Sequence, residues 1–447
     1  MIGRYWIETW GCQMNVHDSE KMAGVLEGLG YRLAPERSAA DLVLLNTCAI
    51  REKAEDRVYT ALEQLRPLKL SRPEMIIGVC GCVAQMTGEA VFARAPFVDL
   101  VIGPRAVSRL PDLLGRLKDE RGLIDTTLYQ DSVLQPDQPV RRGRTKAYVT
   151  IMEGCNKTCT YCVVPGTRGR EVSRPLDAVL SEVQQLAHDG FREVEFLGQN
   201  VNAYRCPASR AGLGDLLRGS SRVAGVKRLR FTTSHPLHLR EPIIRAMAEV
   251  PQVCDYLHLP VQSGSSRILA RMRRGYDREK YLDRIDEVRS AVAGISLSTD
   301  VIVGFPGETE RDFEQTLSLV ESVRFDQMFS FVYSARPGTP AAELADDVVY
   351  GVKVRRLMRL QALQHEIQLE RHRELIGREF EVLVEGPSRR DPQEWAGRTT
   401  CNRVVNFSAP ESGPGQFVRV VITAAGPNSL RARRLECGTV PGLVEIA

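Results

Sequence analysis

Three cysteines stand close together in the middle of the chain, at Cys155, Cys159 and Cys162. The residues before them, 146–152, have the pattern of a β-strand, and a helical pattern resumes only near Pro175. The predicted conformation between these elements is a short loop. Three thiolates on one loop can each bind one iron of a 4Fe-4S cluster, which leaves the fourth iron open to hold a small molecule. The spacing therefore indicates a cluster that does chemistry at its open iron.

Chance and a structural zinc site are the two other interpretations of this triplet. The chain has 11 cysteines among 447 residues, and chance would produce the spacing in fewer than roughly one chain in a hundred of this composition. A structural zinc site is the stronger alternative, although such sites need four ligands and usually come as paired Cys-x2-Cys units. The iron-sulfur reading is favoured, and zinc stays open as the alternative.

The spacing resembles that of the radical S-adenosylmethionine (SAM) enzymes, in which the open iron chelates SAM. In that family the residue before the last cysteine is aromatic and lies against the adenine of SAM. Tyr161 occupies that position here. The resemblance implies that Tyr161 is a SAM-binding residue.

Length and composition indicate an ordinary globular protein of about three domains. Hydrophobic residues make up 43% and charged residues 26% of the chain, and the net charge is +4. No apolar run approaches the ~18 residues that span a bilayer, and the first residues lack the apolar stretch of a secretory signal. We therefore expect a cytoplasmic protein without a membrane partner, whose thiols stay reduced and serve metal or redox chemistry.

Basic residues gather in three places, although the small net charge alone does not indicate a nucleic-acid partner. A solvated surface is the favoured interpretation of these clusters, and phosphate contacts are the alternative. The clusters are Arg141, Arg142, Arg144 and Lys146 before the thiol loop, Arg168, Arg170 and Arg174 after it, and Arg271, Arg273 and Arg274 further on.

The first part of the chain alternates short apolar runs with amphipathic helical patterns. The runs at residues 4–9, 41–46, 74–79 and 98–102 have the length of strands. A βαβαβα order predicts a parallel sheet with helices on both faces.

A second set of three cysteines follows these strands. Cys12, Cys48 and Cys82 each come shortly after the end of a predicted strand. Because the carboxyl ends of parallel strands share one edge of the sheet, we expect the three thiols to meet there and to hold a second open 4Fe-4S cluster. Cys80 competes with Cys82, but it belongs to the apolar run, whereas Gly81 allows the backbone to turn before Cys82.

Residues 146–334 repeat the strand-helix alternation six times. Such units curve into most of a barrel, with functional residues beyond the carboxyl ends of the strands. Gln199 and Gln262 lie there and are candidates for polar contacts to SAM. His235 and His238 look like a metal-binding pair, but packed or solvated histidines are the favoured interpretation.

After a basic amphipathic helix predicted over residues 353–375, the chain changes character. Short strands at 379–385, 404–407, 417–423 and near Leu430 predict a small antiparallel barrel of the OB type. Residues 376–437 contain nine Arg and no Lys, and arginine suits phosphate binding and base stacking.

As a whole, the chain resembles the methylthiotransferases, and within them the MiaB type that modifies tRNA. Of the matching motifs, residues 50–54 separate this type best from sister types that act on threonylcarbamoyl-adenosine or on a ribosomal-protein aspartate. The motifs lie at residues 11–15, 46–54, 81–85, 155–162 and 397–407.

The resemblance implies the organisation and the chemistry. It implies a methylthiotransferase N-terminal domain at 3–118 with an auxiliary cluster, a radical SAM core at 141–371, and an RNA-binding TRAM domain at 374–436. It also implies two 4Fe-4S clusters, with Cys12, Cys48 and Cys82 as ligands of one and Cys155, Cys159 and Cys162 of the other.

The implied reaction adds a methylthio group to carbon 2 of isopentenyl-adenosine beside the tRNA anticodon. A low-potential donor reduces the core cluster, SAM yields a 5′-deoxyadenosyl radical, and the N-terminal cluster delivers the methylthio group. The expected partners are SAM, the tRNA anticodon loop and the electron donor, and the expected state is a monomer. The sister substrates, an iron-sulfur electron carrier and an RNA-binding zinc protein remain as alternatives.

Overall fold

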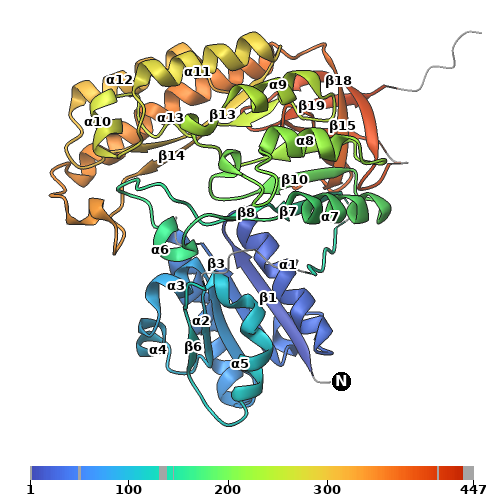
Figure 1. Cartoon of the computed structure of the whole chain (residues 1–447), viewed down its shortest axis with the longest axis vertical. Coiled ribbons are helices and arrows are strands. Elements are labelled where there is room, and N and C mark those ends of the chain that lie inside the picture. The colour runs from blue at the N-terminus through green and yellow to red at the C-terminus, as the bar shows by residue number, and fades with distance from the viewer. Residues whose placement is uncertain (1–2, 49–51, 130–137, 144, 410–411, 436–447) are drawn as a thin grey trace, which may run out of the picture.

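The computed structural model describes residues 3–48, 52–129, 138–143, 145–409 and 412–435. An N-terminal α/β part lies below a central barrel, and a small β-barrel packs against the central barrel's side (Figure 1). Within the described ranges, no helix combines the length and the apolar character needed to cross a bilayer.

The N-terminal part is a parallel sheet covered by helices on both faces, as predicted. Alternation in β3 explains the two layers: Leu42 and Leu44 pack with α1 and α5, whereas Val43 and Leu45 pack with α2 and α4. The strand order is β2-β1-β3-β4-β5-β6. The strands are β1 (Arg4–Trp10), β2 (Arg32–Leu33), β3 (Leu42–Thr47), β4 (Ile76–Gly81), β5 (Leu100–Ile102) and β6 (Leu123–Asp125), and the helices are α1 (Gln13–Gly28), α2 (Glu52–Ser71), α3 (Cys82–Thr87), α4 (Ala90–Arg94) and α5 (Leu110–Arg116).

The central part is an open barrel of six parallel strands. Two three-stranded sheets, β11-β10-β7 and β12-β13-β14, are joined by a bridge between Leu229 and Val253, so β7 and β14 are the two edges. The strands are β7 (Lys146–Thr150), β10 (Glu193–Leu197), β11 (Arg228–Phe231), β12 (Tyr256–His258), β13 (Ser296–Val303) and β14 (Gln327–Val332), and the helices around them are α7 (Leu176–His188), α8 (Leu213–Ser221), α9 (Glu241–Glu249), α10 (Ser266–Arg271), α11 (Arg278–Ala291), α12 (Glu310–Val323) and α13 (Tyr350–Arg373).

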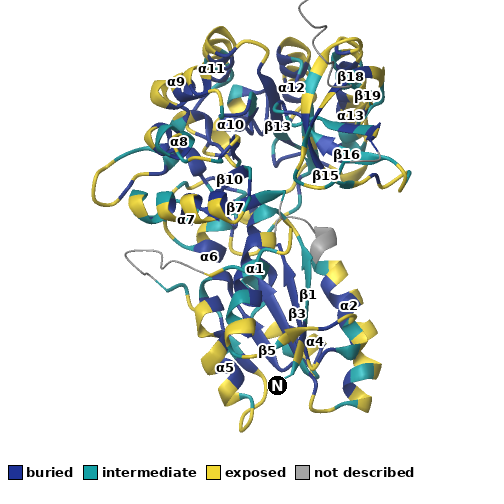
Figure 2. Cartoon of the chain, turned by 90° about the vertical axis from the view of Figure 1, so that its right-hand side faces the viewer, coloured by how far each residue is buried: buried dark blue, intermediate teal, exposed yellow. Residues whose placement is uncertain are grey.

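The strands alternate between a mostly apolar outer face and a mostly polar inner face, except on β14, where Phe329 and Phe331 line the interior. Outward residues such as Val149, Val194 and Leu229 join the core under the helices, which appears as the dark layer inside the barrel wall in Figure 2. The residues between them face the barrel interior and include Lys146, Tyr148, Glu195, Arg230, Thr232, Tyr256, His258 and Asp300. The barrel therefore encloses a polar lumen.

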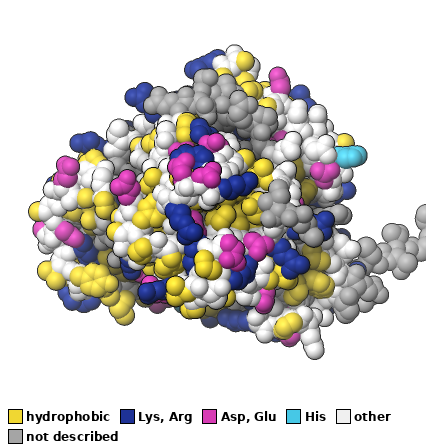
Figure 3. Space-filling model, turned by 90° about the horizontal axis from the view of Figure 1, so that it is seen from below, with side chains coloured by type: hydrophobic (Ala, Val, Ile, Leu, Met, Phe, Trp, Pro, Cys, Tyr) yellow, Lys and Arg dark blue, Asp and Glu magenta, His cyan; other side chains and the backbone are white. Residues whose placement is uncertain are grey.

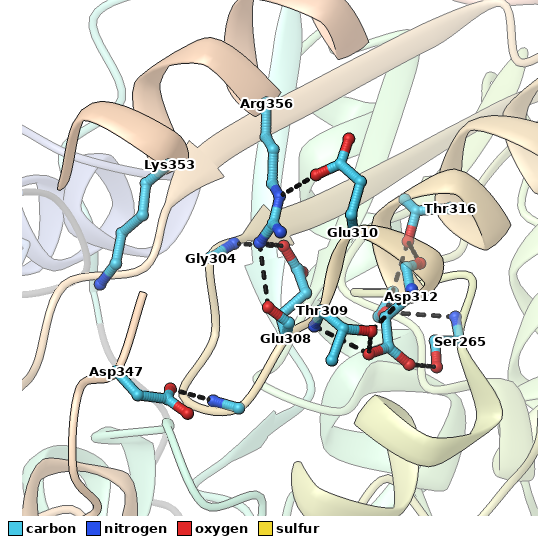
Figure 4. A network of polar contacts seen from close by, with 12 residues as sticks. Ser265, Gly304, Glu308, Thr309, Glu310, Asp312, Thr316, Asp347, Lys353 and Arg356 are labelled. Atoms are coloured by element: carbon cyan, nitrogen blue, oxygen red, sulfur yellow. Dashed lines mark hydrogen bonds and ion pairs between the residues drawn. The ribbon is translucent and has the colours of Figure 1, made fainter. Parts of the chain in front are cut away.

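The loop after β13 is held by side-chain hydrogen bonds (Figure 4). Glu308 Oε1 accepts from Gly304 N at 2.9 Å and from Arg356 Nη1 of α13 at 2.9 Å. Thr309 caps α12, and Asp312 completes the capping box predicted from the sequence. These contacts fix the loop between the fifth strand and its helix.

The C-terminal part is a closed barrel of five strands, ordered β15-β16-β17-β19-β18. All neighbours are antiparallel except β17 and β19, which pair in parallel. The strand β16, which is short and contains Gly397, was not predicted from the sequence. The strands are β15 (Glu379–Pro387), β16 (Trp395–Arg398), β17 (Val404–Ser408), β18 (Phe417–Ala425) and β19 (Leu430–Arg434).

Two arginines of β11 attach this small barrel to the central one. Arg230 donates to the backbone oxygens of Thr399 and Thr400 at 2.7 and 2.8 Å, and its Nε bonds Glu193 at 2.9 Å. Arg228 donates to the backbone oxygens of Arg398 and Glu381, both at 2.8 Å. The segment between β16 and β17 is thus anchored to the barrel wall.

Candidate functional site

A chamber of about 590 Å³ lies where the N-terminal part meets the central barrel. Its walls include Cys12, Cys48 and Cys82 from the N-terminal part, and Val163 and Val164 directly after the thiol loop. The polar lumen of the barrel continues the chamber, and Arg398 and Asn402 of the C-terminal part line it as well. All three parts of the chain thus contribute to one cavity.

The three N-terminal cysteines meet at the edge of the sheet, and Cys82 lines the chamber while Cys80 lies in the apolar core. Cys48 directly follows β3 and Cys82 directly follows β4, because both strands run further than predicted. A Cβ on Gly11 would lie 2.8 Å from the Cβ of Cys48. Gly81 has φ +87°, and a Cβ there would lie 2.7 Å from Thr47 O. Glycine is therefore required at both positions for the three turns to approach one another.

A buried arginine links this set to the thiol loop. Arg168, at the end of α6 (Val164–Arg168), forms a two-pronged ion pair with Asp18 of α1 at 2.5 and 3.3 Å. The hydrogen bond with Cys48 lowers the pKa of Cys12 to about 6 against the effect of burial, and the nearby Arg168 guanidinium contributes to this lowering. A positive group at this place suits an anionic thiolate set.

The thiol loop turns back on itself between β8 (Met152–Glu153) and α6. A Cβ on Gly154, which has φ +80°, would lie 2.6 Å from Gly169 O, and Cys155 N donates to that same oxygen at 3.1 Å. Gln199 Oε1 accepts from Gly154 N at 2.5 Å, so this predicted SAM contact also holds the base of the loop. Gln199 lines the chamber, whereas Gln262 lies outside that lining.

A second buried arginine, Arg274, also contacts the thiol loop. Its Nη1 lies 3.4 Å from Cys159 Sγ, and its Nη2 donates to Pro260 O at 3.0 Å. Tyr161 packs in an apolar cluster with Phe305 and Tyr333. Arg274 therefore supplies positive charge to the second thiol set, as Arg168 does to the first.

The favoured interpretation of the basic clusters as solvated surface is wrong for the arginines that matter most. Arg168, Arg174 and Arg274 are buried. Arg174 pairs with Glu182 at 2.6 Å, and Arg141 pairs with the same carboxylate at 2.6 Å. On the face shown in Figure 3, positive and negative side chains are mixed. Asp18, the partner of Arg168, is 150 positions away in the sequence, whereas Glu182 is only eight positions from Arg174.

Each of the two cysteine sets supplies three free thiols, which is the donor type of iron-sulfur clusters. Among the described residues, no group of three His, Cys, Asp or Glu side chains converges on a single-ion site. Cluster ligands each bind a different iron, so they need not converge on one point. Burial raises the pKa of Cys155 to about 11 and of Cys162 to about 12. These thiols must lose protons when a cluster binds.

The two histidines that looked like a metal pair have structural contacts. His235 caps η4 (Pro236–His238) by accepting from Leu237 N at 3.3 Å, and His238 Nδ1 lies 2.9 Å from Asn200 Nδ2. Burial lowers the pKa of His235 to about 2 and of His238 to about 4. Both rings are neutral at physiological pH.

The lumen of the barrel carries paired charges and hydroxyl groups. Lys146 Nζ lies 2.9 Å from Glu195 Oε2. Burial alone would raise the pKa of Glu195, but the pair with Lys146 lowers it. His258 Nε2 lies 3.4 Å from Asp300 Oδ2, and its Nδ1 lies 2.7 Å from Ser298 Oγ. The lumen thus offers donors and acceptors to a polar ligand. The sequence analysis did not interpret this inward face, although its alternation is visible in residues 146–150, 193–197 and 228–232.

Three family models match successive parts of the chain. Residues 4–103 match the "Uncharacterized protein family UPF0004", residues 149–320 the radical SAM superfamily and residues 373–435 the TRAM domain. The central barrel also resembles solved radical SAM structures. TsrM, a radical SAM methyltransferase from Kitasatospora setae with cobalamin and a 4Fe-4S cluster, gives a TM-score of 0.56 at 15% identity over 76% of this chain and 77% of its own. The fold and these matches define a radical SAM protein.

Curated relatives narrow the assignment. The tRNA-2-methylthio-N(6)-dimethylallyladenosine synthases of Methylococcus capsulatus and Acidithiobacillus ferrooxidans are 49% and 50% identical over 97% and 96% of this chain, and each is covered over 96% of its own length. That of Bordetella petrii is 48% identical over 96% of this chain and 91% of its own. The chain belongs to the tRNA-2-methylthio-N(6)-dimethylallyladenosine synthase family. The motif at residues 50–54 begins outside the described residues.

Proposed function

We propose that this chain transfers a methylthio group to carbon 2 of N6-dimethylallyl (isopentenyl) adenosine next to the anticodon of tRNA. The single observation that carries the proposal is the shared chamber, into which the N-terminal cysteine set, the flank of the thiol loop and the polar lumen all open. A reaction that needs a radical source and a sulfur donor at one base requires both in one cavity. The sequence identity to the curated relatives supports the same substrate.

Six cysteines hold two 4Fe-4S clusters in this proposal. Cys12, Cys48 and Cys82 hold the one that provides sulfur, and Cys155, Cys159 and Cys162 hold the one that binds SAM. When bound, the SAM cluster supplies one-electron cleavage of SAM to a carbon radical that abstracts hydrogen, and the other cluster supplies the methylthio group. The residue ranges 3–118, 141–371 and 374–436 are the proposed limits of the three functional domains.

The chain's own residues position these groups and the substrate. Gln199 fixes the start of the thiol loop through Gly154, and Arg274 and Arg168 place positive charge beside the two thiol sets. Tyr161, Gln199 and Gln262 are the proposed SAM contacts, and of these three Gln199 is the one that lines the chamber. The lumen pairs Lys146–Glu195 and His258–Asp300 hydrogen-bond the polar parts of SAM and the target nucleotide.

An anticodon loop is single-stranded, so its bases can be presented to the chamber at a smaller unstacking cost than duplex bases. The C-terminal barrel is the proposed RNA handle, with arginines supplying salt-dependent affinity. A low-potential one-electron donor and a monomeric state complete the proposal.

The test is reconstitution of the protein with iron and sulfide, followed by incubation with SAM, a reductant and tRNA that carries N6-dimethylallyl-adenosine. Nucleoside mass spectrometry should detect the methylthio product together with 5′-deoxyadenosine. Thiolation of threonylcarbamoyl-adenosine or of a ribosomal-protein aspartate instead would reassign the substrate. Absence of 5′-deoxyadenosine would indicate an electron carrier, and zinc without labile sulfide would indicate a zinc protein.

A further inference from the structure

A second, shallower groove of about 430 Å³ lies outside the chamber, between the edge strand β14 and helix α13. Phe329 and Phe331 of β14 line both the groove and the chamber. Phe329 is 40% exposed, and its ring meets the His258 ring of the lumen edge-on at 6.1 Å between centroids. The two phenylalanines therefore form a wall between the chamber and the groove.

The α13 side of the groove is polar but uncharged. Gln361, Gln364, His365 and Gln368 line it, and no Lys, Arg, Asp or Glu is among its lining residues. Aromatic rings beside amide groups suit a nucleobase, which stacks on the ring and hydrogen-bonds along its edge. A phosphate would need positive charge, which this lining lacks.

The three glutamines offer acceptors to such a base. Each donates through Nε2 to the protein: Gln361 to Ser330 Oγ at 3.3 Å, Gln364 to Phe325 O at 2.8 Å and Gln368 to Pro427 O at 2.6 Å. Gln364 is only 5% exposed, and its Oε1 has no hydrogen-bond partner among the described residues. A buried unpaired acceptor costs free energy, but this oxygen is closed to solvent, so a ligand can donate to it only when the Gln364 side chain turns toward the groove.

The position of the groove also fits RNA. One end borders the chamber through Phe329 and Phe331. The other end reaches the C-terminal barrel, where Gln368 bonds Pro427 O and His372 Nδ1 lies 2.7 Å from Gly426 O. A strand of RNA that runs from the C-terminal barrel to the chamber passes this groove.

We infer that the groove binds an unstacked nucleobase with an exocyclic amino group, from a nucleotide beside the modified adenosine of the same RNA. The base stacks on the Phe329 ring, and its amino group donates to Gln364 Oε1 once the Gln364 side chain has turned toward the groove. The inference rests on the proposed function, since it presumes an RNA substrate whose target base enters the chamber. Adenine, cytosine and guanine carry such an amino group, and uracil does not.

The experiment is a double-mutant cycle between protein and RNA. The reconstituted protein with SAM is titrated with an anticodon stem-loop that carries N6-dimethylallyl-adenosine, and with versions in which one other unpaired loop nucleotide at a time is abasic. We expect one abasic position to weaken binding to the wild type about tenfold, or ~1.4 kcal/mol. Phe329→Ala should weaken binding of the intact loop by a similar factor, and the combination should lose no more than either change alone.

Control variants separate stacking from damage to the fold. Met358→Ala changes a residue of α13 that is 64% exposed and lies outside the groove lining, and it should bind the RNA as the wild type does. Phe329→Trp keeps an aromatic face and should retain most of the affinity. At the sensitive position, the wild type should prefer adenine to unsubstituted purine, and Gln364→Met should remove this preference.

Additive losses at every abasic position would overturn the inference, and so would unchanged affinity in Phe329→Ala. If Phe329→Ala instead lowered turnover only with a protein reductant and not with a chemical one, the groove would be a protein-docking site. Failure of the proposed function gives a different result. If the wild type bound the loop without methylthiolating it, the proposed function would be refuted, and the binding energies of the double-mutant cycle could still be measured.

Discussion

Arg168 connects the two halves of the proposed active site, and replacing it with methionine should be strongly destabilising. Its side chain and that of Asp18 are 2% and 3% exposed, and the two groups form a two-pronged ion pair. Removing one partner of such a pair leaves a buried charge without compensation, which costs about 3–5 kcal/mol. Arg168 bonds Asp18 directly, whereas the other buried cations nearby, Lys21 and Arg105, pair with Glu153 at 3.3 and 3.4 Å.

Denaturant unfolding of the cluster-free protein measures this cost. Arg168→Met should lower the unfolding free energy of the transition that includes the N-terminal part by about 3–5 kcal/mol, and its melting temperature by roughly 10 °C. Iron retained per chain after reconstitution gives a second reading, because the guanidinium also lies beside the N-terminal thiols. Arg116→Met is the matched control, since its pair with Glu120 is exposed on α5 and should contribute less than about 1 kcal/mol.

The double variant Arg168→Met with Asp18→Leu separates the cost of an unpaired charge from the contribution of the intact ion pair. Replacing a buried ion pair by apolar groups of similar volume is often neutral, so the double variant should recover most of the loss. Additive losses, or a cost below about 1 kcal/mol for Arg168→Met alone, would refute the reasoning.

Three further predictions follow from other parts of the structure. Cys155→Ala should abolish reductive SAM cleavage and keep about half of the iron. Cys48→Ala should permit abortive SAM cleavage without thiolation. If Cys48→Ala formed methylthio product at the wild-type rate, the assignment of separate roles to the two cysteine sets would be contradicted. Arg230→Met leaves Glu193 buried without its 2.9 Å partner and removes two bonds to the C-terminal barrel, so limited proteolysis near residue 374 should accelerate several-fold; Arg419→Met, in an exposed pair, is the control. The lowered pKa of His238 means that the folded state resists its protonation, so stability present above pH 6.5 should be lost as the pH falls toward 4. At pH 5.5 the loss should be about 1 kcal/mol or less after screening, and His238→Gln should flatten the pH dependence of denaturant midpoints; an unchanged slope would argue against this origin.

The sequence located the cysteine sets because a parallel sheet leaves little freedom. Once residues 41–46 and 74–79 are identified as parallel strands, the turns after them must share one edge, so Cys48 and Cys82 come together. The distinction between Cys80 and Cys82 was also readable, because Gly81 marks the end of the strand, and the structure places Cys80 in the apolar core.

The electrostatic environment of the cysteines could not be predicted in the same way. Arg168 and Asp18 lie 150 positions apart, and Arg274 and Cys159 lie 115 apart. Local sequence shows only that an arginine is present, whereas its burial depends on the tertiary packing of distant segments. The same reason hid the attachment of Arg230 to Thr399.

The attachment of the C-terminal barrel to β11 fixes the distance between this barrel and the chamber. Arg228 and Arg230 donate to four backbone oxygens of the C-terminal barrel, and one further bond, from Arg228 to Glu381 Oε1, involves a side chain there. In the proposed function, RNA held by the C-terminal barrel therefore meets the chamber at a fixed separation.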